Sequence, residues 1–266
     1  MEPKLRPNIL FIMSDDHASK AISAYGHGLN STPGIDRIAN EGMRLDHCYV
    51  TNSICTPSRA AILTGTYNHV NGVTTLDTHI DNRWPNVAKH LRQSGYQTAM
   101  IGKWHLGEGT PHEPTGFDYW SVLPGQGEYF DPLMIEMGEE RTEPGYVTDI
   151  ITDKSLGWLR DRDPDRPFFL MCHHKAPHRT WEPAREHFTM YDDVDIPEPE
   201  TMFDDHATRA AVVQAMRMRL LDLDPIVDLK APVPPGLSED EEVRWRYQRY
   251  IKDYLRVIAS IDDNVG

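Results

Sequence analysis

Short apolar runs that stop abruptly at polar residues are the feature that most constrains the fold of this chain. The clearest run covers residues 8–13 (NILFIM) and ends at Ser14, Asp15 and Asp16. A continuous apolar run of this length is typical of a strand buried in a parallel sheet, and its polar end indicates that the strand opens into a loop. Ligands of open α/β sheets bind at the carboxyl ends of the strands. We therefore expect Asp15 and Asp16 to lie at a ligand-binding edge.

Helical and extended patterns alternate through the next part of the sequence. The spacing of apolar residues predicts helices, and short apolar runs predict strands. Helices are expected over residues 33–41, 57–63, 85–94 and 150–159, and further strands over residues 97–101 and 168–172. This alternation predicts an α/β fold with a mostly parallel sheet flanked by helices on both faces. Two stretches, residues 107–145 and 192–199, are expected to be long surface insertions.

The last part of the sequence carries a longer helical pattern. Apolar residues recur at helical spacing over residues 239–265, which predicts a long amphipathic helix. The pattern is still in register at Gly266, so we expect that the chain is truncated at its C-terminus. A length of 266 residues is sufficient for one large domain or two small ones.

The charge and the hydropathy pattern exclude some classes of partner. The 41 acidic and 27 basic side chains give a net charge of −14, which is opposite to that of a nucleic-acid-binding protein. No apolar run approaches the roughly 20 residues that span a bilayer, so no membrane partner is expected. Lys4 and Arg6 precede the first apolar run as in a secretion signal, but that run is short and ends in aspartates where a signal has its cleavage site. The sequence as it stands therefore predicts a cytoplasmic protein.

One of the three cysteines, Cys55, lies in a distinctive run. The odd number of cysteines and the lack of a Cys-x-x-Cys pair argue against a disulfide framework or a structural zinc site. Cys55 precedes Pro57, which suits the first turn of a helix, so its side chain is expected near backbone N–H groups that have no helical acceptor. Arg59 follows one turn later and can reach the same place. Together these residues predict an anion-accepting pocket, whereas an isolated cysteine here would more often be a small buried hydrophobic residue.

Four segments of the sequence match motifs of one enzyme family. Residues 55–59 (CTPSR) are followed by residues 63–65 (LTG). The other three segments are residues 7–16 (PNILFIMSDD), 102–107 (GKWHLG) and 176–178 (APH). These segments resemble the formylglycine-dependent sulfatases, in which the first is the activation motif, and the resemblance implies an alkaline phosphatase-like α/β fold. All four occur in the order of that family and extend over most of residues 7–181.

The resemblance implies a modified residue and a metal ion. In this family a separate maturating enzyme oxidises the cysteine to formylglycine, whose hydrate is the nucleophile. The same modification is therefore implied for Cys55, with a formylglycine-generating enzyme as partner. A divalent cation is also implied, calcium or alternatively magnesium, held by Asp15 and Asp16 and in contact with the formylglycine at Cys55. Without the resemblance, two adjacent aspartates would fit a solvated turn equally well.

The resemblance also assigns the remaining catalytic residues. Lys103 and His178 would bind the sulfate oxygens, and Arg59 would help to neutralise their charge. His105 would contact the formylglycine hydrate, and His178 could pass a proton to the leaving oxygen. Lys103 and His105 follow the strand expected over residues 97–101, so both can face the same edge if the segment stays extended. No role is assigned to His173, His174 or Lys175.

The resemblance places residues 1–266 in the N-terminal part of a sulfatase catalytic domain. The cation site of the family takes further ligands from a downstream Ser-Asp-His-Gly or Asp-Asn-Gly segment that follows a strand, and this sequence has no such segment. Residues 262–266 (DDNVG) look similar, but they continue a helical pattern and follow no apolar strand, so we do not take them as ligands.

The sequence specifies the substrate less closely than it specifies the type of reaction. Residues 179–183 (RTWEP) look most like bacterial sulfatases that act on sulfated amino sugars of glycosaminoglycans. The net charge of −14 repels a sulfated polymer at long range, so a small sulfate ester fits at least as well as a carbohydrate polymer. Two alternatives stay open, a phosphonate or phosphodiester hydrolase of the same superfamily and a truncated, non-catalytic remnant that binds anions or sugars.

Overall fold

The structure is a computed structural model that describes residues 6–266. Lys4, one of the two basic residues before the first apolar run, lies outside the described residues. The chain divides into two compact units, one formed by residues up to Asp15 with Met43–Lys175, the other by Asp16–Gly42 with Ala176–Gly266. Within residues 6–266, the helices are too short or too polar for any of them to cross a membrane.

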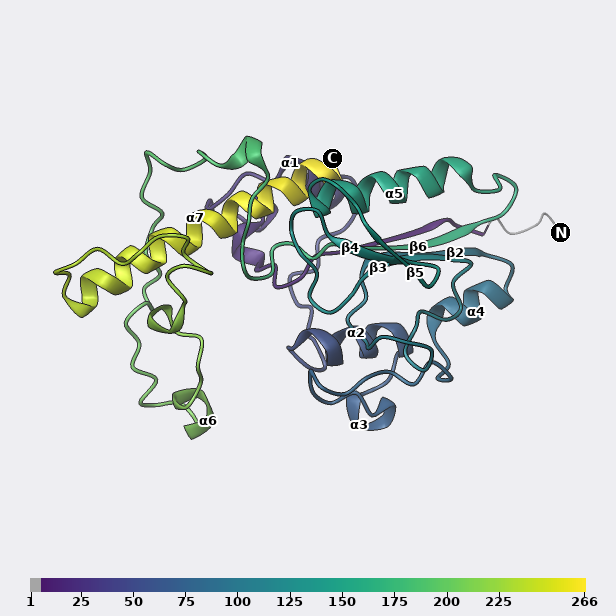
Figure 1. The fold of residues 1–266 in the computed structure, drawn as a ribbon, viewed down its shortest axis with the longest axis horizontal. Helices are drawn as coiled ribbons and strands as arrows, with labels where there is room; N and C mark the ends of the chain where they lie inside the picture. The colour runs from purple at the N-terminus through teal and green to yellow at the C-terminus, as the bar shows by residue number, and fades with distance from the viewer. Residues whose placement is uncertain (1–5) are drawn as a thin grey trace. The chain divides into compact units, whose positions relative to one another are not determined.

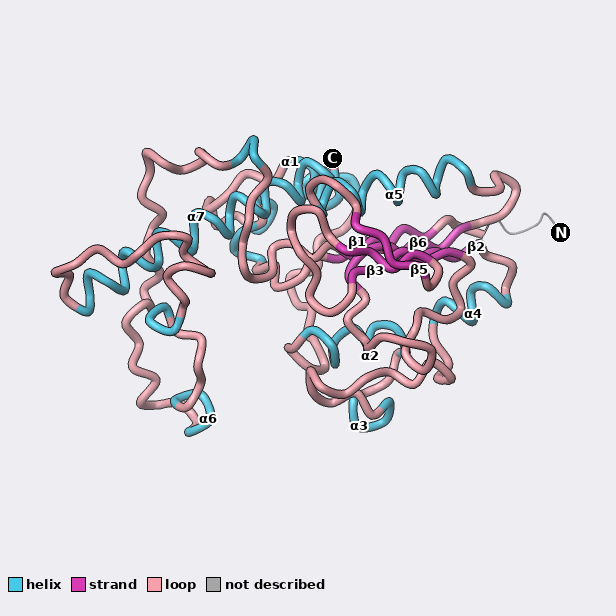
Figure 2. The backbone as a smooth tube through the Cα atoms, viewed as in Figure 1, coloured by secondary structure: helices cyan, strands magenta, loops and turns pink. Residues whose placement is uncertain are grey.

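A six-stranded sheet forms the centre of the first unit (Figure 2). Its strands are β1 (Ile9–Met13), β2 (Gln97–Lys103), β3 (Tyr119–Leu123), β4 (Leu133–Glu136), β5 (Glu139–Thr142) and β6 (Phe168–His173). The order across the sheet is β1-β6-β2-β3-β4-β5. The first four strands in this order pair in parallel, whereas β4 and β5 pair antiparallel at one edge. The sheet is therefore parallel in its central part and mixed as a whole.

Helices cover both faces of this sheet, as the sequence predicts. The helices of the first unit are α2 (Cys55–Thr64), α3 (Asn68–Asn71), α4 (Val87–Gln93) and α5 (Val147–Asp161). Figure 1 shows α5 on one face and α2 and α4 on the other. Helix α2 ends at Gly65, whose φ of 67° is in the left-handed region that glycine adopts without strain.

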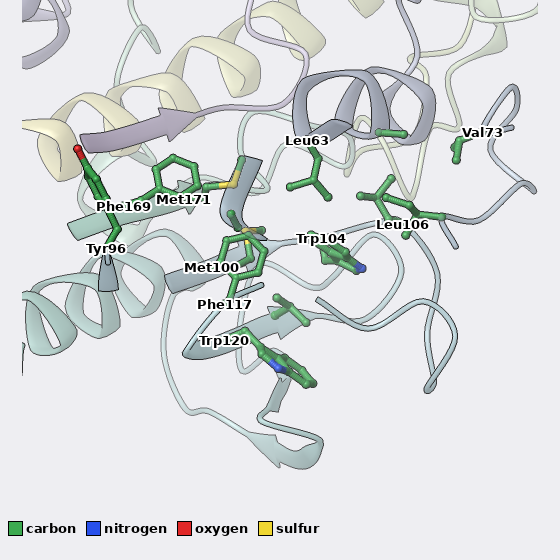
Figure 3. Packing of buried hydrophobic residues seen from close by; sticks show 14 residues of the cluster. Leu63, Val73, Tyr96, Met100, Trp104, Leu106, Phe117, Trp120, Phe169 and Met171 are labelled. Atoms are coloured by element: carbon green, nitrogen blue, oxygen red, sulfur yellow. The ribbon is translucent and has the colours of Figure 1, made fainter. Parts of the chain in front are cut away.

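The core of the first unit lies between its sheet and helices. Buried apolar side chains come from α2 and α4 and from the strands β2, β3 and β6 (Figure 3). The largest include Met100, Trp104, Phe117, Trp120 and Phe169, each less than 10% exposed. Burying one side chain of this size stabilises the fold by about 1.5–3 kcal/mol, so this cluster is a major source of the unit's stability.

The second unit is built around the long C-terminal helix. Its α-helices are α1 (Pro33–Glu41), α6 (Ala211–Gln214) and α7 (Glu239–Val265), and its 3-10 helices are Ser19–Ala21, Ser23–Tyr25, Arg185–His187 and Leu220–Asp222. Helix α7 begins with a capping box in which Ser238 and Glu241 each bond to the other's backbone N–H. At its other end the Asp262 side chain accepts hydrogen bonds from Gly34 N at 3.1 Å and Ile35 N at 2.8 Å, at the start of α1.

Two helices are where the sequence places them, and several other boundaries differ. The ranges predicted for α1 and α7 are confirmed. Helix α2 begins at Cys55, two residues before the predicted start. Helix α4 begins later than predicted, at Val87, because the Asn86 side chain accepts a hydrogen bond from Lys89 N and caps it.

The predicted insertion over residues 107–145 is wrong in part. This stretch contains β3, β4 and β5, so it extends the sheet and is not only a surface loop. Glycines and prolines dominate the pattern of this stretch and obscure the short strands between them. The stretch over residues 192–199 has no helix or strand, as predicted.

Candidate active site

A buried ion pair lies at the carboxyl ends of the parallel strands in the first unit. Lys103 is the last residue of β2 and is fully buried. Its Nζ donates hydrogen bonds to Oδ2 of Asp15, just beyond β1, and to Oε1 of Gln126. Burial lowers the pKa of Lys103, and the neighbouring carboxylate of Asp15 opposes that shift. The structure therefore joins two of the predicted site residues directly.

Arg59 brings a second positive charge to the same carboxylate. Its guanidinium, on α2, is 4% exposed, and Nη2 lies 3.6 Å from Oδ2 of Asp15. Nη1 donates to the backbone carbonyl of Lys103 at 2.6 Å and lies 3.3 Å from Nδ1 of His173. Burial and the charge of Arg59 hold the pKa of His173 well below its ordinary value, so this histidine is neutral. Two buried cations thus share one carboxylate, which leaves the cluster with an excess positive charge.

The close approach of two strands explains the glycine before Lys103. Gly102 pairs with His173 across β2 and β6, and its φ is 103°. A Cβ at this position would lie 2.0 Å from the His173 carbonyl oxygen, so only glycine fits. This glycine lets β6 lie close enough to β2 for His173 to contact Arg59.

Cys55 and His105 lie near the start of α2. Cys55 is the first residue of this helix and is half-buried. The hydroxyl of Thr56, the next residue, lies 3.4 Å from Nδ1 of His105. Strand β2 extends to Lys103, and His105 then adopts a left-handed φ of 53°. The segment therefore does not stay extended, which is the condition set for Lys103 and His105 to face the same edge: the chain turns after the strand, and His105 lies beside Thr56 of α2.

The second unit contains the other two predicted site residues. Nε2 of His178 lies 3.8 Å from Oδ2 of Asp16, whose side chain is largely exposed. Nδ1 of His178 donates a hydrogen bond to the backbone carbonyl of Arg179 at 2.7 Å. The hydroxyl of Tyr254, on α7, donates to the backbone carbonyl of Asp16 at 2.8 Å and accepts from Ala18 N at 2.8 Å. Helix α7 thus holds the backbone that carries Asp16.

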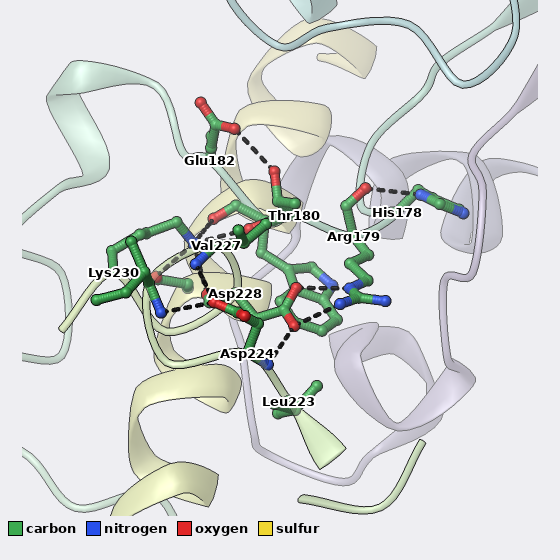
Figure 4. A network of polar contacts seen from close by, with 12 residues as sticks. His178, Arg179, Thr180, Glu182, Leu223, Asp224, Val227, Asp228 and Lys230 are labelled. Atoms are coloured by element: carbon green, nitrogen blue, oxygen red, sulfur yellow. Dashed lines mark hydrogen bonds and ion pairs between the residues drawn. The ribbon is translucent and has the colours of Figure 1, made fainter. Parts of the chain in front are cut away.

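A polar network fixes the segment that follows His178 (Figure 4). Arg179 donates two hydrogen bonds to the fully buried carboxylate of Asp228, at 2.5 and 2.6 Å. Nζ of Lys230 donates to the backbone carbonyls of Thr180 and Trp181, at 2.7 and 3.0 Å. This geometry binds residues 178–181 to the loop that precedes α7.

The structure shows the surroundings of His173, His174 and Lys175, to which the sequence assigns no role. His173 contacts Arg59, as described above. His174 is buried, its Nε2 lies 3.8 Å from Sγ of Cys172, and burial lowers its pKa to about 4. The Lys175 ammonium lies 4.6 Å from the centroid of the Tyr129 ring. Gln126, which binds Lys103, was missed because it falls in the predicted insertion and no motif marks it.

The predicted metal ligands have the kind of side chain that binds a hard cation. Asp15 and Asp16 supply carboxylate oxygens, which calcium and magnesium prefer. Within residues 6–266, no three or more His, Cys, Asp or Glu side chains come together as a complete metal site. Residues 262–265 continue α7 to its last residue, and the Asp262 side chain caps α1.

Comparison with known proteins gives a consistent set of similarities. The sulfatase family model matches residues 7–266. N-acetylglucosamine-6-O-sulfatase of Bacteroides thetaiotaomicron is 40% identical, over all of this chain and 54% of its own length. Human N-acetylglucosamine-6-sulfatase is 30% identical, over 76% of this chain and 40% of its own length.

A solved structure shows the same relationship in three dimensions. A protein in complex with its substrate D-glucosamine-2-N,6-O-disulfate superimposes with a TM-score of 0.94 at 40% identity, over 98% of this chain and 61% of the other. The chain spans about half the length of the curated relatives it matches.

Proposed function

This chain belongs to the sulfatase family, and on that basis we propose that it carries the nucleophile and the sulfate-binding cations of an enzyme that hydrolyses a sulfate ester of an amino sugar. The reaction breaks the bond between sulfur and the ester oxygen and adds the elements of water, releasing sulfate and the alcohol. Two relatives named for N-acetylglucosamine sulfate support the amino-sugar substrate.

The cluster of Arg59, Lys103 and Asp15 is the observation that carries this proposal. Two cations around one carboxylate, each less than 10% exposed, leave a net positive charge in a largely desolvated place. An anion entering beside them compensates this charge, and cations already held in place stabilise developing charge without reorganising. Arg59 and Lys103 are therefore proposed to bind and orient the sulfate oxygens.

Cys55 is proposed to be the residue that a maturating enzyme converts to formylglycine. The hydrate of that aldehyde would supply the hydroxyl that attacks sulfur, which an unmodified thiol does not. The first turn of α2 surrounds this position with helical N–H groups, which favour negative charge. His105 is proposed to hold the nucleophile in position, because its Nδ1 lies beside Thr56.

Asp15 and Asp16 are the residues proposed to hold the divalent cation, with calcium preferred and magnesium as the alternative. When bound, such an ion makes a hydroxyl group beside it more acidic. Asp15 also neutralises part of the charge of Lys103, and this pairing holds the lysine side chain in one orientation.

His178 is proposed to contact the sulfate and to protonate the leaving oxygen. Its Nδ1–H donates to the Arg179 carbonyl, so Nε2 is an acceptor in the neutral ring, and only the imidazolium form carries an Nε2 proton that can pass to the leaving oxygen. The network around Asp228 and Lys230 holds the backbone on which this histidine lies. A proton delivered to the leaving oxygen helps the alcohol depart.

Turnover of two chromogenic esters tests the reaction. The protein in its full natural chain, co-expressed with a formylglycine-generating enzyme, is assayed with 4-nitrophenyl sulfate and with bis(4-nitrophenyl) phosphate, which have the same leaving group. We expect a higher kcat/KM for the sulfate. A higher value for the diester would support the phosphodiesterase alternative, and mass spectrometry of the Cys55 peptide reports whether the thiol has become an aldehyde.

A thermal unfolding titration tests the non-catalytic alternative. A ligand that binds only the native state raises the unfolding temperature as its concentration increases. We expect calcium to raise it in the wild-type protein and to have less effect in Asp16→Asn, whereas Asp161→Asn is the matched control at a surface position of α5. A wild-type protein that calcium does not stabilise, and that turns over neither ester, would favour the remnant.

A further inference from the structure

Asp16, one of the two proposed cation ligands, combines an uncommon backbone conformation with an exposed side chain. Its φ is 63°, in the left-handed region that residues with a side chain rarely adopt. Its carboxylate is 62% exposed, and its Oδ2 lies 3.8 Å from Nε2 of His178. Because solvent surrounds most of the carboxylate, its position depends mainly on the conformation of the backbone that carries it.

The hydroxyl of Tyr254, on α7, holds this backbone on both sides of the turn. It donates to the Asp16 carbonyl and accepts from Ala18 N, each at 2.8 Å. A phenol has one proton to donate, so this hydroxyl acts both as donor and as acceptor. The Ala18 carbonyl in turn accepts from Ala21 N at 3.0 Å, at the start of the next 3-10 helix. One side chain therefore bridges the two ends of the turn that contains the ligand.

Packing fixes the direction in which the Tyr254 hydroxyl points. The side chain is 5% exposed, and the centroid of its ring lies 5.8 Å from that of Tyr250. The Tyr250 ring lies in turn 4.7 Å from the ring of Trp181, edge to face. Residues whose rotamers are locked by packing can hold a binding group in one geometry. Tyr254 meets this condition for Asp16.

Helix α7 is attached at two further places to the segment that carries Asp16. The Asn30 side chain donates to the Leu255 carbonyl at 3.2 Å. The Asp262 side chain caps α1, which lies beside the end of α7 (Figure 1). The helix therefore keeps its place when the Tyr254 hydroxyl is removed, and Tyr254→Phe deletes the contact with the turn without unfolding the unit.

We infer that Tyr254 is a positioning residue that sets the conformation of Asp16 before the divalent cation arrives and so raises the affinity of the site for that ion. The inference rests on the proposed function, because that function places the cation at Asp15 and Asp16. A ligand ordered in advance binds without the loss of entropy that ordering a free loop would require. Tyr254 lies 238 residues from Asp16 along the chain and belongs to none of the four motifs.

Calcium binding to the metal-free protein tests the inference. The full natural chain is titrated calorimetrically with calcium chloride, both as the wild type and as Tyr254→Phe, which lacks only the hydroxyl. We expect the Kd for calcium to be about tenfold higher in the variant, because the turn must then be ordered as the ion binds.

Tyr247→Phe is the matched control on the same helix. Tyr247 is 7% exposed, and its hydroxyl donates to the Pro197 carbonyl at 2.7 Å, so this change also removes a buried hydroxyl. It should lower the unfolding temperature of the metal-free protein about as much as Tyr254→Phe does. The Kd for calcium should change by less than about twofold, because Tyr247 does not contact the turn.

Hydrogen exchange in the metal-free protein is a second measurement that does not depend on the ion. The Ala18 N–H donates to the Tyr254 hydroxyl, so it should exchange about tenfold faster in Tyr254→Phe than in the wild type. The same amide should exchange at the wild-type rate in Tyr247→Phe. An unchanged rate at Ala18 in Tyr254→Phe would show that the hydroxyl does not hold the turn and would overturn the inference.

The outcomes separate this inference from the proposed function. If the wild-type protein binds calcium and Tyr254→Phe binds it as tightly, the inference is overturned while the cation site stands. If the wild type binds neither calcium nor magnesium, the cation site of the proposed function fails, and the inference fails with it. Equal rises in the Kd for calcium in Tyr254→Phe and Tyr247→Phe would indicate a general structural effect and also overturn the inference.

Discussion

Nδ1 of His173 lies 3.3 Å from Nη1 of Arg59, and this contact orients a residue that is proposed to bind sulfate. Because His173 is buried and neutral, its Nδ1 can accept a hydrogen bond from the guanidinium. The Lys103 carbonyl accepts the second bond from the same nitrogen. Arg59 is thus held from two sides, and His173 acts on the site through it as a positioning residue.

We expect His173→Phe to lower kcat/KM for the sulfate ester by at least about tenfold, since a hydrogen bond from a charged group contributes about 1.5–3 kcal/mol and a misaligned cation adds to that loss. His173→Asn places an amide oxygen near the position of Nδ1 and should restore most of the activity. A purely structural role would lower the unfolding temperature of both variants equally and leave their kcat/KM values alike.

The two neighbouring histidines should make stability depend on pH. Burial lowers the pKa of His174 from 6.5 to about 4, so between these values the unfolded chain binds a proton that the native state does not. The unfolding free energy therefore falls as the pH falls from 6.5 to 4, by about 3 kcal/mol at most from this residue. His173, whose pKa is also lowered, changes stability in the same direction.

Urea unfolding between pH 4.5 and 7.5 measures this dependence. The unfolding free energy of His174→Leu should depend less steeply on pH than that of the wild-type protein. The difference in slope should correspond to about one bound proton, because one titrating group is gone. His69→Leu, at an exposed position on α3, is the matched control and should keep the wild-type dependence. An unchanged slope in His174→Leu would contradict this prediction.

The end of α7 should contribute to stability by capping α1. Asp262 accepts hydrogen bonds from Gly34 N and Ile35 N, while Thr32 at the N-cap makes no side-chain cap. Asp262→Ala should therefore lower the unfolding free energy by about 1 kcal/mol. Asp153→Ala, at an exposed position of α5, leaves this cap intact and should change the unfolding free energy by less than about 0.5 kcal/mol. Equal losses of unfolding free energy in Asp262→Ala and in the control variant, measured by chemical unfolding, would refute the capping role.

Arg179→Ala should destabilise the second unit by about 3 kcal/mol, because it leaves the fully buried carboxylate of Asp228 without its ion-pair partner. Arg185→Ala, a few residues away and outside this network, is the control. The double variant Arg179→Ala with Asp228→Ala should regain part of the loss, since no unpaired charge remains buried. Additive losses in thermal or urea unfolding would show that the two side chains act independently.

Only one cysteine should be needed for turnover. Cys55→Ala should abolish sulfatase activity, because no other residue can supply the aldehyde hydrate. Cys48 is exposed, and Cys48→Ala should leave kcat unchanged. Cys172 is buried, so Cys172→Ala should lower stability by about 1 kcal/mol through lost packing, with kcat retained in the folded fraction. Activity in Cys55→Ala would refute the mechanism.

Much of the fold follows from local pattern. The ranges of α1 and α7 were predictable because apolar residues recur at helical spacing over both segments. The strands β1, β2 and β6 were predictable because each is a short apolar run. The strands β3, β4 and β5 were not, because they are brief and lie among glycines, and β4 and β5 depend on pairing with a neighbour.

By itself, the sequence determined the family, the α/β fold and the identities of Cys55, Arg59, Lys103, His105 and His178 as the residues to consider, because each lies in a short motif. Only the tertiary structure decided that Gln126 and His173 bind Lys103 and Arg59, and that His105 turns toward α2. Gln126 is 23 residues from Lys103 along the chain, and His173 is 114 residues from Arg59. Contacts over such separations depend on strand order and register, which no local pattern encodes.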